Sequence, residues 1–379
     1  MRTIYLDYNA TTPIAPSVQQ AMLPFLTEHF GNPSSSHALG RAAHEALEDA
    51  RSQLALLIKA DREEIVFTAG GTESNNLALQ GTLMRRAPGA AGHLIISAIE
   101  HPSVLEPARF LERLGYDLTI VGVDRQGIVD LDAIRVAIRP DTVLVSIMHA
   151  NNEIGSVQPI AEIANICHER DVLLHTDASQ SVGKIRTPVD ELQVDFLTVA
   201  GHKMYAPKGV GALYIRRGLG LEPVMHGAGH EGGLRAGTEN VASIVGLGRA
   251  AALATKGMDQ ASQRMELLRE RLFDQLRAGV GSGLTLHGSK AARLPNTLSV
   301  SFPGVTGGAM LARLPELCAS TGSACHSAAP HMSPTLAAIG LAPDVAAGTI
   351  RLSVGWYTSE EDIDRAASAL LSAWDGLRS

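Results

Sequence analysis

The sequence predicts an α/β protein, with one large domain built on a mainly parallel sheet flanked by helices and a smaller α+β domain. Short apolar runs alternate with segments of helical period through the first two thirds of the chain. This alternation is typical of a parallel sheet covered by helices on both faces. A long helical stretch at 240–278 then leads into a second block with strands of its own. The 379 residues, 45% of them hydrophobic, suffice for both cores.

The strand predictions of the first block rest on short apolar runs bounded by polar residues or glycine. These runs lie at 65–68, 93–97, 117–121, 143–147, 172–176, 196–199 and 212–215. Amphipathic segments with the period of a helix separate several of them, at 38–58, 73–84, 103–114 and 161–170. Sheets of this class bind ligands at the carboxyl ends of their strands, so the residues that follow each run are the candidates for a site.

The second block predicts the smaller domain. Its strand candidates lie at 296–301, 317–320 and 349–353, and a last helix begins at Glu360. We expect a large domain over residues 13–255. The small domain then combines residues 1–12 with residues 256–379.

Charge and composition exclude several classes of function. The net charge is −7 and the sequence pI is near 6.1, a mild acidic excess that is scattered along the chain, so we expect no direct nucleic-acid partner. No run of about 18 apolar residues occurs, and no apolar leader precedes Asp7, so we expect neither a membrane span nor export. The cysteines are Cys167, Cys318 and Cys325, a sparse set that indicates reduced thiols in the cytoplasm. Cys167 fits the inner face of a helix and Cys318 a strand, so we expect both in the core.

Two predicted strands end in groups of opposite charge. The run at 172–176 leads to Asp177, and the run at 196–199 leads to His202 and Lys203. A lysine amine can form a Schiff base with an aldehyde cofactor. A carboxylate that faces a pyridine nitrogen keeps it protonated, so that the ring can take up electrons. The alternative is a buried ion pair between Asp177 and Lys203.

Two further motifs follow strand candidates. Gly70, Gly71 and Thr72 lead from a strand into a helix, where free N–H groups and a hydroxyl could hold a phosphate. His101 follows another strand, where an imidazole could stack on a ring and move protons. Taken alone, the first motif is equally typical of a tight turn with a helix cap, and the histidine of a structural cap.

Together the motifs resemble those of the cysteine desulfurases, which are fold type I pyridoxal-phosphate (PLP) enzymes related to the aminotransferases. The resemblance runs in order from about residue 4 to residue 370. The segments that carry it lie at 5–13, 31–34, 71–76, 149–155, 175–180, 201–203, 235–240 and 322–325.

The resemblance implies a role for each candidate residue. Lys203 carries the cofactor, His101 stacks on its ring and moves protons, and Asp177 pairs with the pyridine nitrogen. The phenolic oxygen and the phosphate are held by Gln180, His202, Thr72 and the backbone at Gly71, with Thr238 supplied by the other subunit of a homodimer. Asn152 also lies by the cofactor, and with Arg351 it grips the substrate carboxylate, for which a guanidinium fork is suited.

Cys325 is implied as the residue that receives sulfur. It lies among small residues and glycine at 320–334, a composition typical of a surface loop. Its thiolate would be the nucleophile, and His326 could lower the thiol pKa. The alternatives are an inert loop thiol, or a metal site formed with His326 and His331. Because no second ligand cluster with recognised spacing is visible, we predict no metal.

The implied activity removes sulfur from L-cysteine, giving L-alanine and a persulfide on Cys325. The persulfide then passes to an acceptor protein in iron–sulfur cluster assembly or another thiolation pathway. Selenocysteine lyase shares the fold and is the nearest alternative, and a non-catalytic scaffold is a second. A scaffold should have lost Lys203, Cys325 or Arg351, yet all three are present.

Three positions depart from the family pattern. Ala200 stands where a serine is common, which removes one hydroxyl from the expected phosphate site. Gly232 and Trp356 stand where arginines are common, and we expect these two changes to affect surface or partner contacts.

Overall fold

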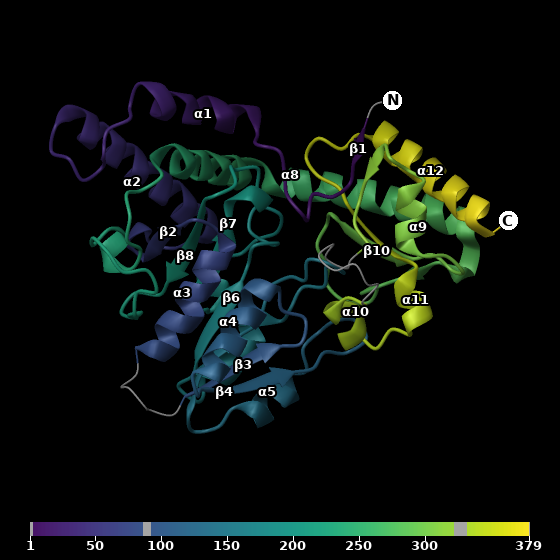
Figure 1. Ribbon diagram of the computed structural model, residues 1–379, viewed down its shortest axis with the longest axis horizontal. Coiled ribbons are helices and arrows are strands. Elements are labelled where there is room, and N and C mark those ends of the chain that lie inside the picture. Colours follow the sequence, from purple (N-terminus) through teal and green to yellow (C-terminus); the bar gives the residue numbers. More distant parts are fainter. Residues whose placement is uncertain (1–2, 86–91, 322–331, 379) are drawn as a thin grey trace.

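The computed structural model describes residues 3–85, 92–321 and 332–378, and within them a seven-stranded sheet forms the centre of the large half. Its strand order is β2-β8-β7-β6-β5-β3-β4 (Figure 1). The five strands from β7 to β4 run parallel, whereas β8 is antiparallel to both of its neighbours. The strands are β2 (Ile65–Thr68), β3 (His93–Ser97), β4 (Asp117–Val121), β5 (Thr142–Ser146), β6 (Leu173–Asp177), β7 (Phe196–Ala200) and β8 (Gly211–Ile215). The predicted mainly parallel sheet is confirmed.

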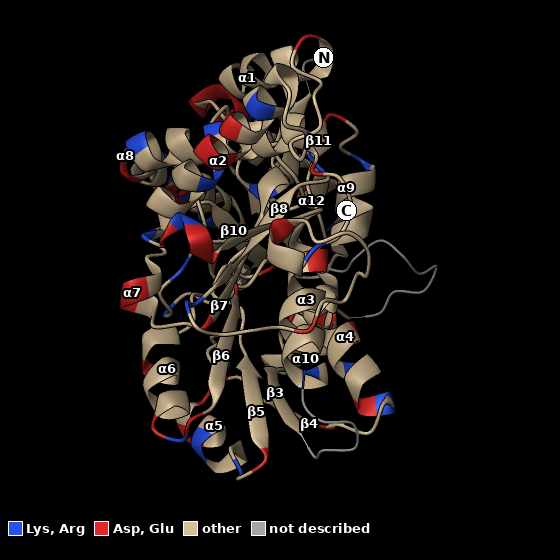
Figure 2. Ribbon diagram, turned by 90° about the vertical axis from the view of Figure 1, so that its left-hand side faces the viewer, with Lys and Arg blue, Asp and Glu red and all other residues tan. Residues whose placement is uncertain are grey.

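Helices cover both faces of this sheet. The cluster on one face includes Leu79 of α3 and Leu111 of α4, and the cluster on the other includes Leu54 of α2 and Ile163 of α6. Figure 2 shows the sheet between α5 and α6 on one side and α3 and α4 on the other. The bounds are α2 (Ala38–Ile58), α3 (Gly71–Met84), α4 (Pro102–Arg113), α5 (Leu131–Ala137), α6 (Ile160–His168) and α7 (Val189–Leu192).

Burial explains why the inner strands could be predicted from the sequence. Every residue of β3, β7 and β8 is buried, so these strands are near-continuous apolar runs. The edge strand β4 instead has only Val121 buried. Strand β6 extends to Asp177, one residue beyond the predicted run, because it pairs with Thr198 of β7.

The smaller half holds a three-stranded antiparallel sheet in the order β12-β10-β9 among the described residues. A short parallel pair, β1 with β11, lies beside it and ties the N-terminus to this half. The strands are β1 (Ile4–Tyr5), β9 (Thr285–Leu286), β10 (Thr297–Ser301), β11 (Leu317–Cys318) and β12 (Thr349–Ser353). The helices are α9 (Gly307–Ala312), α10 (Pro334–Ala338), α11 (Pro343–Ala347) and α12 (Glu360–Arg378).

The 40-residue helix α8 (Val241–Val280) runs through both halves (Figure 1). It contributes Leu247 and Ala254 to the core of the large half, and Met265 and Leu272 to the core of the small half. On this division of the core we propose the domain boundary near residue 255. None of the helices in the described ranges is both long and apolar enough to cross a membrane.

Some elements were not predicted. Helix α1 (Pro16–Thr27) contains Pro24 and buries only Val18, so its periodicity is weak. The helices α9 to α11 have six residues or fewer, too few to show a period. Cys167 is buried as predicted, but the prediction for Cys318 is wrong in part, because the two-residue strand β11 leaves its thiol half-buried.

Candidate active site

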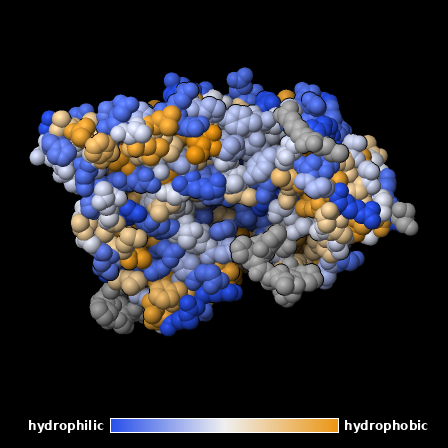
Figure 3. All heavy atoms as spheres, turned by 45° about the horizontal axis from the view of Figure 1, so that its top comes forward, coloured by the Kyte–Doolittle hydropathy of each residue, from blue (hydrophilic) through white to orange (hydrophobic). Residues whose placement is uncertain are grey.

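A cavity of about 500 Å³ lies where β6 and β7 end and where β12 approaches from the small half. Figure 3 shows a hollow with hydrophilic side chains near the middle of the face it displays. The structure brings nine predicted site residues to the cavity wall. They are Gly71, Thr72, His101, Asn152, Asp177, Gln180, His202, Lys203 and Arg351.

Lys203 ends the short 3₁₀ turn that directly follows β7. Its Nζ donates to the main-chain oxygens of Asn9, at 2.6 Å, and Ala10, at 2.8 Å. Burial and the neighbouring charge of Arg351 lower the pKa of Lys203 to about 8. A much larger share of this amine is therefore neutral near pH 7 than for an exposed lysine, which suits a nucleophile or a base.

Asp177 is the last residue of β6 and is buried. Its Oδ2 accepts from Asn75 Nδ2 of α3 at 2.8 Å, and its Oδ1 accepts from the main-chain N–H of Ser179 at 2.9 Å. The hydrogen bonds of Asp177 and those of Lys203 thus go to different partners. This arrangement does not favour the alternative of a simple ion pair between them, and it leaves both groups facing the cavity.

His101 is the N-cap of α4, because its Nδ1 accepts from the main-chain N–H of Ser103 at 3.1 Å. The structural cap is therefore confirmed, while its imidazole also lines the cavity. Burial lowers the pKa of His101, an effect that Asp177 opposes and Lys203 reinforces. A neutral ring of this kind is able to accept a proton, and its stacking role stays a prediction.

The β2–α3 turn brings backbone close to the cavity. Gly70 has φ +147°, and a Cβ placed on Gly71 would lie 3.0 Å from Ser179 Oγ and 3.3 Å from Ala200 Cβ. The first turn of a helix leaves its N–H groups without intrahelical acceptors, so this end can receive an anion. Ser179 supplies a hydroxyl on the side where Ala200 has none. Burial lowers the pKa of the nearby His202 to about 4.

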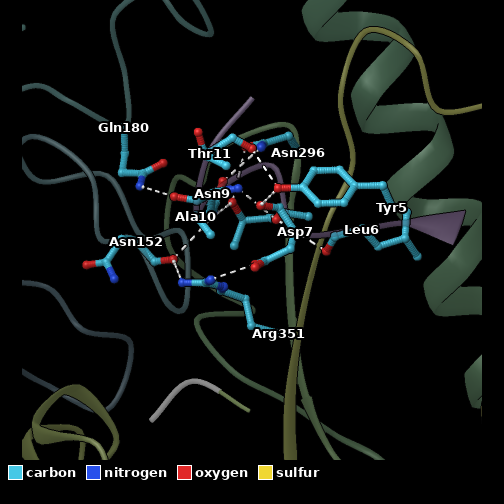
Figure 4. A network of polar contacts seen from close by, with 12 residues as sticks. Tyr5, Leu6, Asp7, Asn9, Ala10, Thr11, Asn152, Gln180, Asn296 and Arg351 are labelled. Atoms are coloured by element: carbon cyan, nitrogen blue, oxygen red, sulfur yellow. Dashed lines mark hydrogen bonds and ion pairs between the residues drawn. The ribbon is translucent and has the colours of Figure 1, made fainter. Parts of the chain in front are cut away.

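Arg351 projects from β12 toward the cavity (Figure 4). Its Nη1 donates to the main-chain oxygen of Asn152 at 3.0 Å, and its Nη2 pairs with Asp7 Oδ1 at 2.7 Å. Its Nε is buried and has no hydrogen-bond partner. The guanidinium is thus fixed by two groups and keeps donors for an anionic ligand. Asn152 contributes its carbonyl to this arrangement.

Sequence reasoning missed Asn9, which lies at the centre of the network in Figure 4. Its Nδ2 donates to Thr297 Oγ1 at 2.8 Å and to the main-chain oxygen of Asn152 at 3.1 Å. Its own carbonyl accepts from Lys203 and from Gln180 Nε2, the latter at 3.0 Å. Residues 5–13 belong to one of the family motifs, and no local pattern in this segment indicates which of its side chains turns inward.

Sequence reasoning also missed two buried ionisable residues at the site, Lys184 and Glu100. Lys184 donates to Gln180 Oε1 at 2.8 Å and so fixes the orientation of that amide. Buried Glu100 lines the cavity, and its Oε1 accepts from Ser97 Oγ at 2.6 Å and from the N–H of Met148 at 2.8 Å. Its Oε2 has no partner, and burial raises the pKa of Glu100 to about 8. An acid directly before His101 was the available signal.

Two predicted site residues are not part of the described cavity. Thr238 is exposed and is not among the residues that line the cavity, and its role on another subunit stays a prediction. Cys325 lies outside the described residues, as do His326 and His331 of the alternative metal site. Within the described ranges, no group of three or more His, Cys, Asp or Glu side chains could hold a metal ion.

Comparison with known proteins assigns the family. The aminotransferase class-V family matches residues 4–366. A protein named cysteine desulfurase IscS from Dictyoglomus turgidum is 46% identical, covering 100% of this chain and 96% of that protein. Another of that name, from Methylobacillus flagellatus, is 44% identical over 99% of this chain and 93% of its own length.

Solved structures agree. A NifS-like protein superposes with a TM-score of 0.92 at 35% identity, covering 99% of this chain and all of that one. The structure of SspA in complex with cysteine superposes with a TM-score of 0.82 at 38% identity, covering 94% of this chain and all of that one. The chain belongs to the aminotransferase class-V family and, within it, to the cysteine desulfurases.

Proposed function

We propose that this chain is a PLP-dependent cysteine desulfurase that converts L-cysteine to L-alanine and delivers the sulfur to an acceptor protein. One observation carries the proposal beyond family membership. The lysine of the turn after β7, the carboxylate at the end of β6 and the guanidinium of β12 surround one cavity.

The donor set of the cavity fits pyridoxal phosphate. An amine of lowered pKa, a buried carboxylate and an open helix N-terminus are the groups that an aldehyde, a pyridine nitrogen and a phosphate require. The aldehyde would be held by Lys203, the pyridine nitrogen by Asp177, and the phosphate by His202 and the turn at Gly71 and Thr72. Gln180 would hold the phenolic oxygen, and His101 would stack on the ring. When bound, the cofactor supplies an electron sink for charge that develops on the substrate α-carbon.

The residues of the chain then perform the remaining tasks. Arg351 binds the substrate carboxylate through its free donors, and Asp7 and the carbonyl of Asn152 keep the guanidinium in place. Once its amine is free, Lys203 can take the α-proton, because its pKa of about 8 lies near neutral pH. Cys325 is the proposed nucleophile toward the substrate Sγ. We propose that the acceptor belongs to iron–sulfur cluster assembly or another thiolation pathway.

Replacing Cys325 tests the proposal. We expect Cys325→Ala to retain the visible absorbance of the bound cofactor and to bind L-cysteine, but to release no sulfide above background. Cys318→Ala is the matched control, since that half-buried thiol lies in β11 and should leave sulfide release unchanged. Alanine and sulfide are measured after incubation with L-cysteine and a reductant. Normal sulfide release by Cys325→Ala would contradict the nucleophile assignment, and absence of both products in the unmodified enzyme would refute the activity.

We also propose a homodimer, in which Thr238 reaches the cofactor phosphate of the other subunit, and a cytoplasmic location. The mass of the protein in solution tests the homodimer. Relative rates with L-cysteine and L-selenocysteine separate the proposed activity from the alternative, a selenocysteine lyase.

A further inference from the structure

Trp356 follows β12 and lies between the two cores. It is half-buried and packs against the core clusters of both halves. Its indole stacks on the Tyr205 ring, with the centroids 3.8 Å apart and the planes at 14°. Its main-chain N–H donates to Tyr205 Oη at 2.7 Å. Trp356 is therefore joined to the large half by a stacked ring and a hydrogen bond.

Tyr205 lies two residues after Lys203, on the same turn. Its φ of 66° lies in the left-handed region, which is unusual for an aromatic residue. The main chain is held there by Thr12 Oγ1, which accepts from the Tyr205 N–H at 2.9 Å, and by the Ala15 N–H, which donates to the Tyr205 oxygen at 3.1 Å. A left-handed conformation at such a residue persists only where the surrounding structure enforces it. The turn that carries Lys203 therefore depends on the hydrogen bonds of the Tyr205 main chain.

The other side of the stack is fixed with respect to Arg351. Trp356 lies five residues after Arg351, and Arg264 of α8 donates to the main-chain oxygens of Trp356, at 2.9 Å, and Thr358, at 2.6 Å. A Cβ on Gly355 would lie 2.2 Å from the Tyr8 ring, so glycine is required for this close approach. The turn after β12 is thus anchored on the helix that joins the two cores.

We propose that Trp356 is a positioning residue whose stack on Tyr205 sets the spacing between Lys203 and Arg351 and thereby the affinity for the substrate. The inference rests on the proposed function, in which one amino acid contacts both groups at once. Neither aromatic ring lines the cavity as described, so the stack acts through the two turns it joins. A ligand that must reach two elements from different cores binds best when their spacing is set before it arrives.

Paired leucine substitutions at the two tryptophans test the proposal in the holoenzyme. Trp356→Leu removes the stack but keeps apolar bulk, and we expect KM for L-cysteine to rise about fivefold while kcat changes less than about twofold. Trp374→Leu is the matched control. Trp374 is 5% exposed, belongs to α12 and donates to the Pro303 oxygen, so this variant should lower the melting temperature and leave KM unchanged. Trp356→Phe, which keeps a ring on Tyr205, should restore KM to within about twofold of the unmodified enzyme.

Hydrogen exchange supplies a readout that does not depend on turnover. Amides of residues 201–206 should exchange faster in Trp356→Leu than in the unmodified holoenzyme, and at the unmodified rate in Trp374→Leu. An enzyme that makes alanine and sulfide, and whose Trp356→Leu variant keeps both its KM and this exchange rate, would overturn the positioning role alone. An unmodified enzyme that makes neither product would instead overturn the proposed function, whatever the exchange data show.

Discussion

Burial fixes the protonation state of Glu100 in a way that the residue type does not suggest. The carboxyl has two donors on Oε1 and none on Oε2, and its pKa is raised to about 8. At neutral pH the folded protein therefore carries this group mainly as the neutral acid, beside His101 and near Asp177. Ionisation would place a second negative charge next to the proposed cofactor site.

This shift predicts a pH-dependent difference between the unmodified protein and Glu100→Gln. The unfolded state loses the Glu100 proton near pH 4.5, whereas the folded state keeps it to about pH 8. The stability due to this group is therefore fully present below pH 4.5 and is lost as the pH rises to 8, with a slope of at most about 1.4 kcal/mol per pH unit. The glutamine side chain of the variant cannot ionise. The free energy of unfolding of Glu100→Gln, relative to that of the unmodified protein at the same pH, should therefore increase from pH 5 to pH 8 and then level off. Urea titrations at several pH values measure it, and a constant difference would contradict the assignment.

Ala200 allows a test at the scale of one atom. It lines the cavity, and its Cβ would lie 3.3 Å from a Cβ on Gly71. We expect Ala200→Ser to slow the loss of cofactor on dilution about three- to tenfold, since one added hydrogen bond contributes about 0.5–1.5 kcal/mol. Ser179→Ala should act in the opposite direction. Visible absorbance after gel filtration measures both, and equal retention in the two variants would argue against a phosphate at this turn.

At the scale of elements, the β2–α3 turn depends on a glycine in a different strand. A Cβ on Gly211 of β8 would lie 2.5 Å from the Val199 oxygen and 2.7 Å from Gly70 Cα. The absence of a side chain at Gly211 thus lets the proposed phosphate turn rest on the sheet. This contact joins residues about 140 positions apart, so no local pattern indicated it.

We therefore predict that Gly211→Ala displaces this turn. The variant should lose about 1–3 kcal/mol of stability through overpacking and should also bind the cofactor more weakly. Gly257→Ala is the control, because nothing lies within 4 Å of the added Cβ in the middle of α8. That change should raise stability by up to about 1 kcal/mol through helix propensity. A Gly211→Ala protein with unchanged melting temperature and cofactor titration would refute the prediction.

At the scale of the whole molecule, the two halves are held together by α8 and by the N-terminal segment. Ile4 and Leu6 belong to the small core and Tyr8 to the large one, so the chain crosses between them just before Asn9. Asn9 then bonds to Asn152 of the large half and to Asn296 and Thr297 of the small half. The candidate site lies on this boundary, which is why residues near both ends of the chain line one cavity.

Removing the Asn9 side chain should therefore lower the free energy of unfolding of the whole protein. Asn9→Ala leaves the buried amide of Asn296 and the hydroxyl of Thr297 each with one partner fewer, at a cost of about 2–4 kcal/mol in the free energy of unfolding. Asn32→Ala is the control, because the side chain of that exposed residue accepts from the N–H of Ser34 in its own turn. Urea denaturation of both variants measures the difference, and similar midpoints would contradict a joining role for Asn9.

Local patterns in the sequence determined the alternation of strands and helices, the mainly parallel sheet and the polar residues at its strand ends. These features could be predicted because buried parallel strands are continuous apolar runs, and because their carboxyl ends meet at one edge. The family motifs added Arg351, which no local spacing connects to Lys203.

Only the tertiary structure decided how these groups are held. The Asn9 network, the neutral Glu100, the Tyr205–Trp356 stack and the half-buried Cys318 all depend on contacts between distant segments or on the extent of burial. The free energy of such a contact comes from desolvation and packing against residues far away in the chain. It therefore leaves no periodic signal around the residue itself.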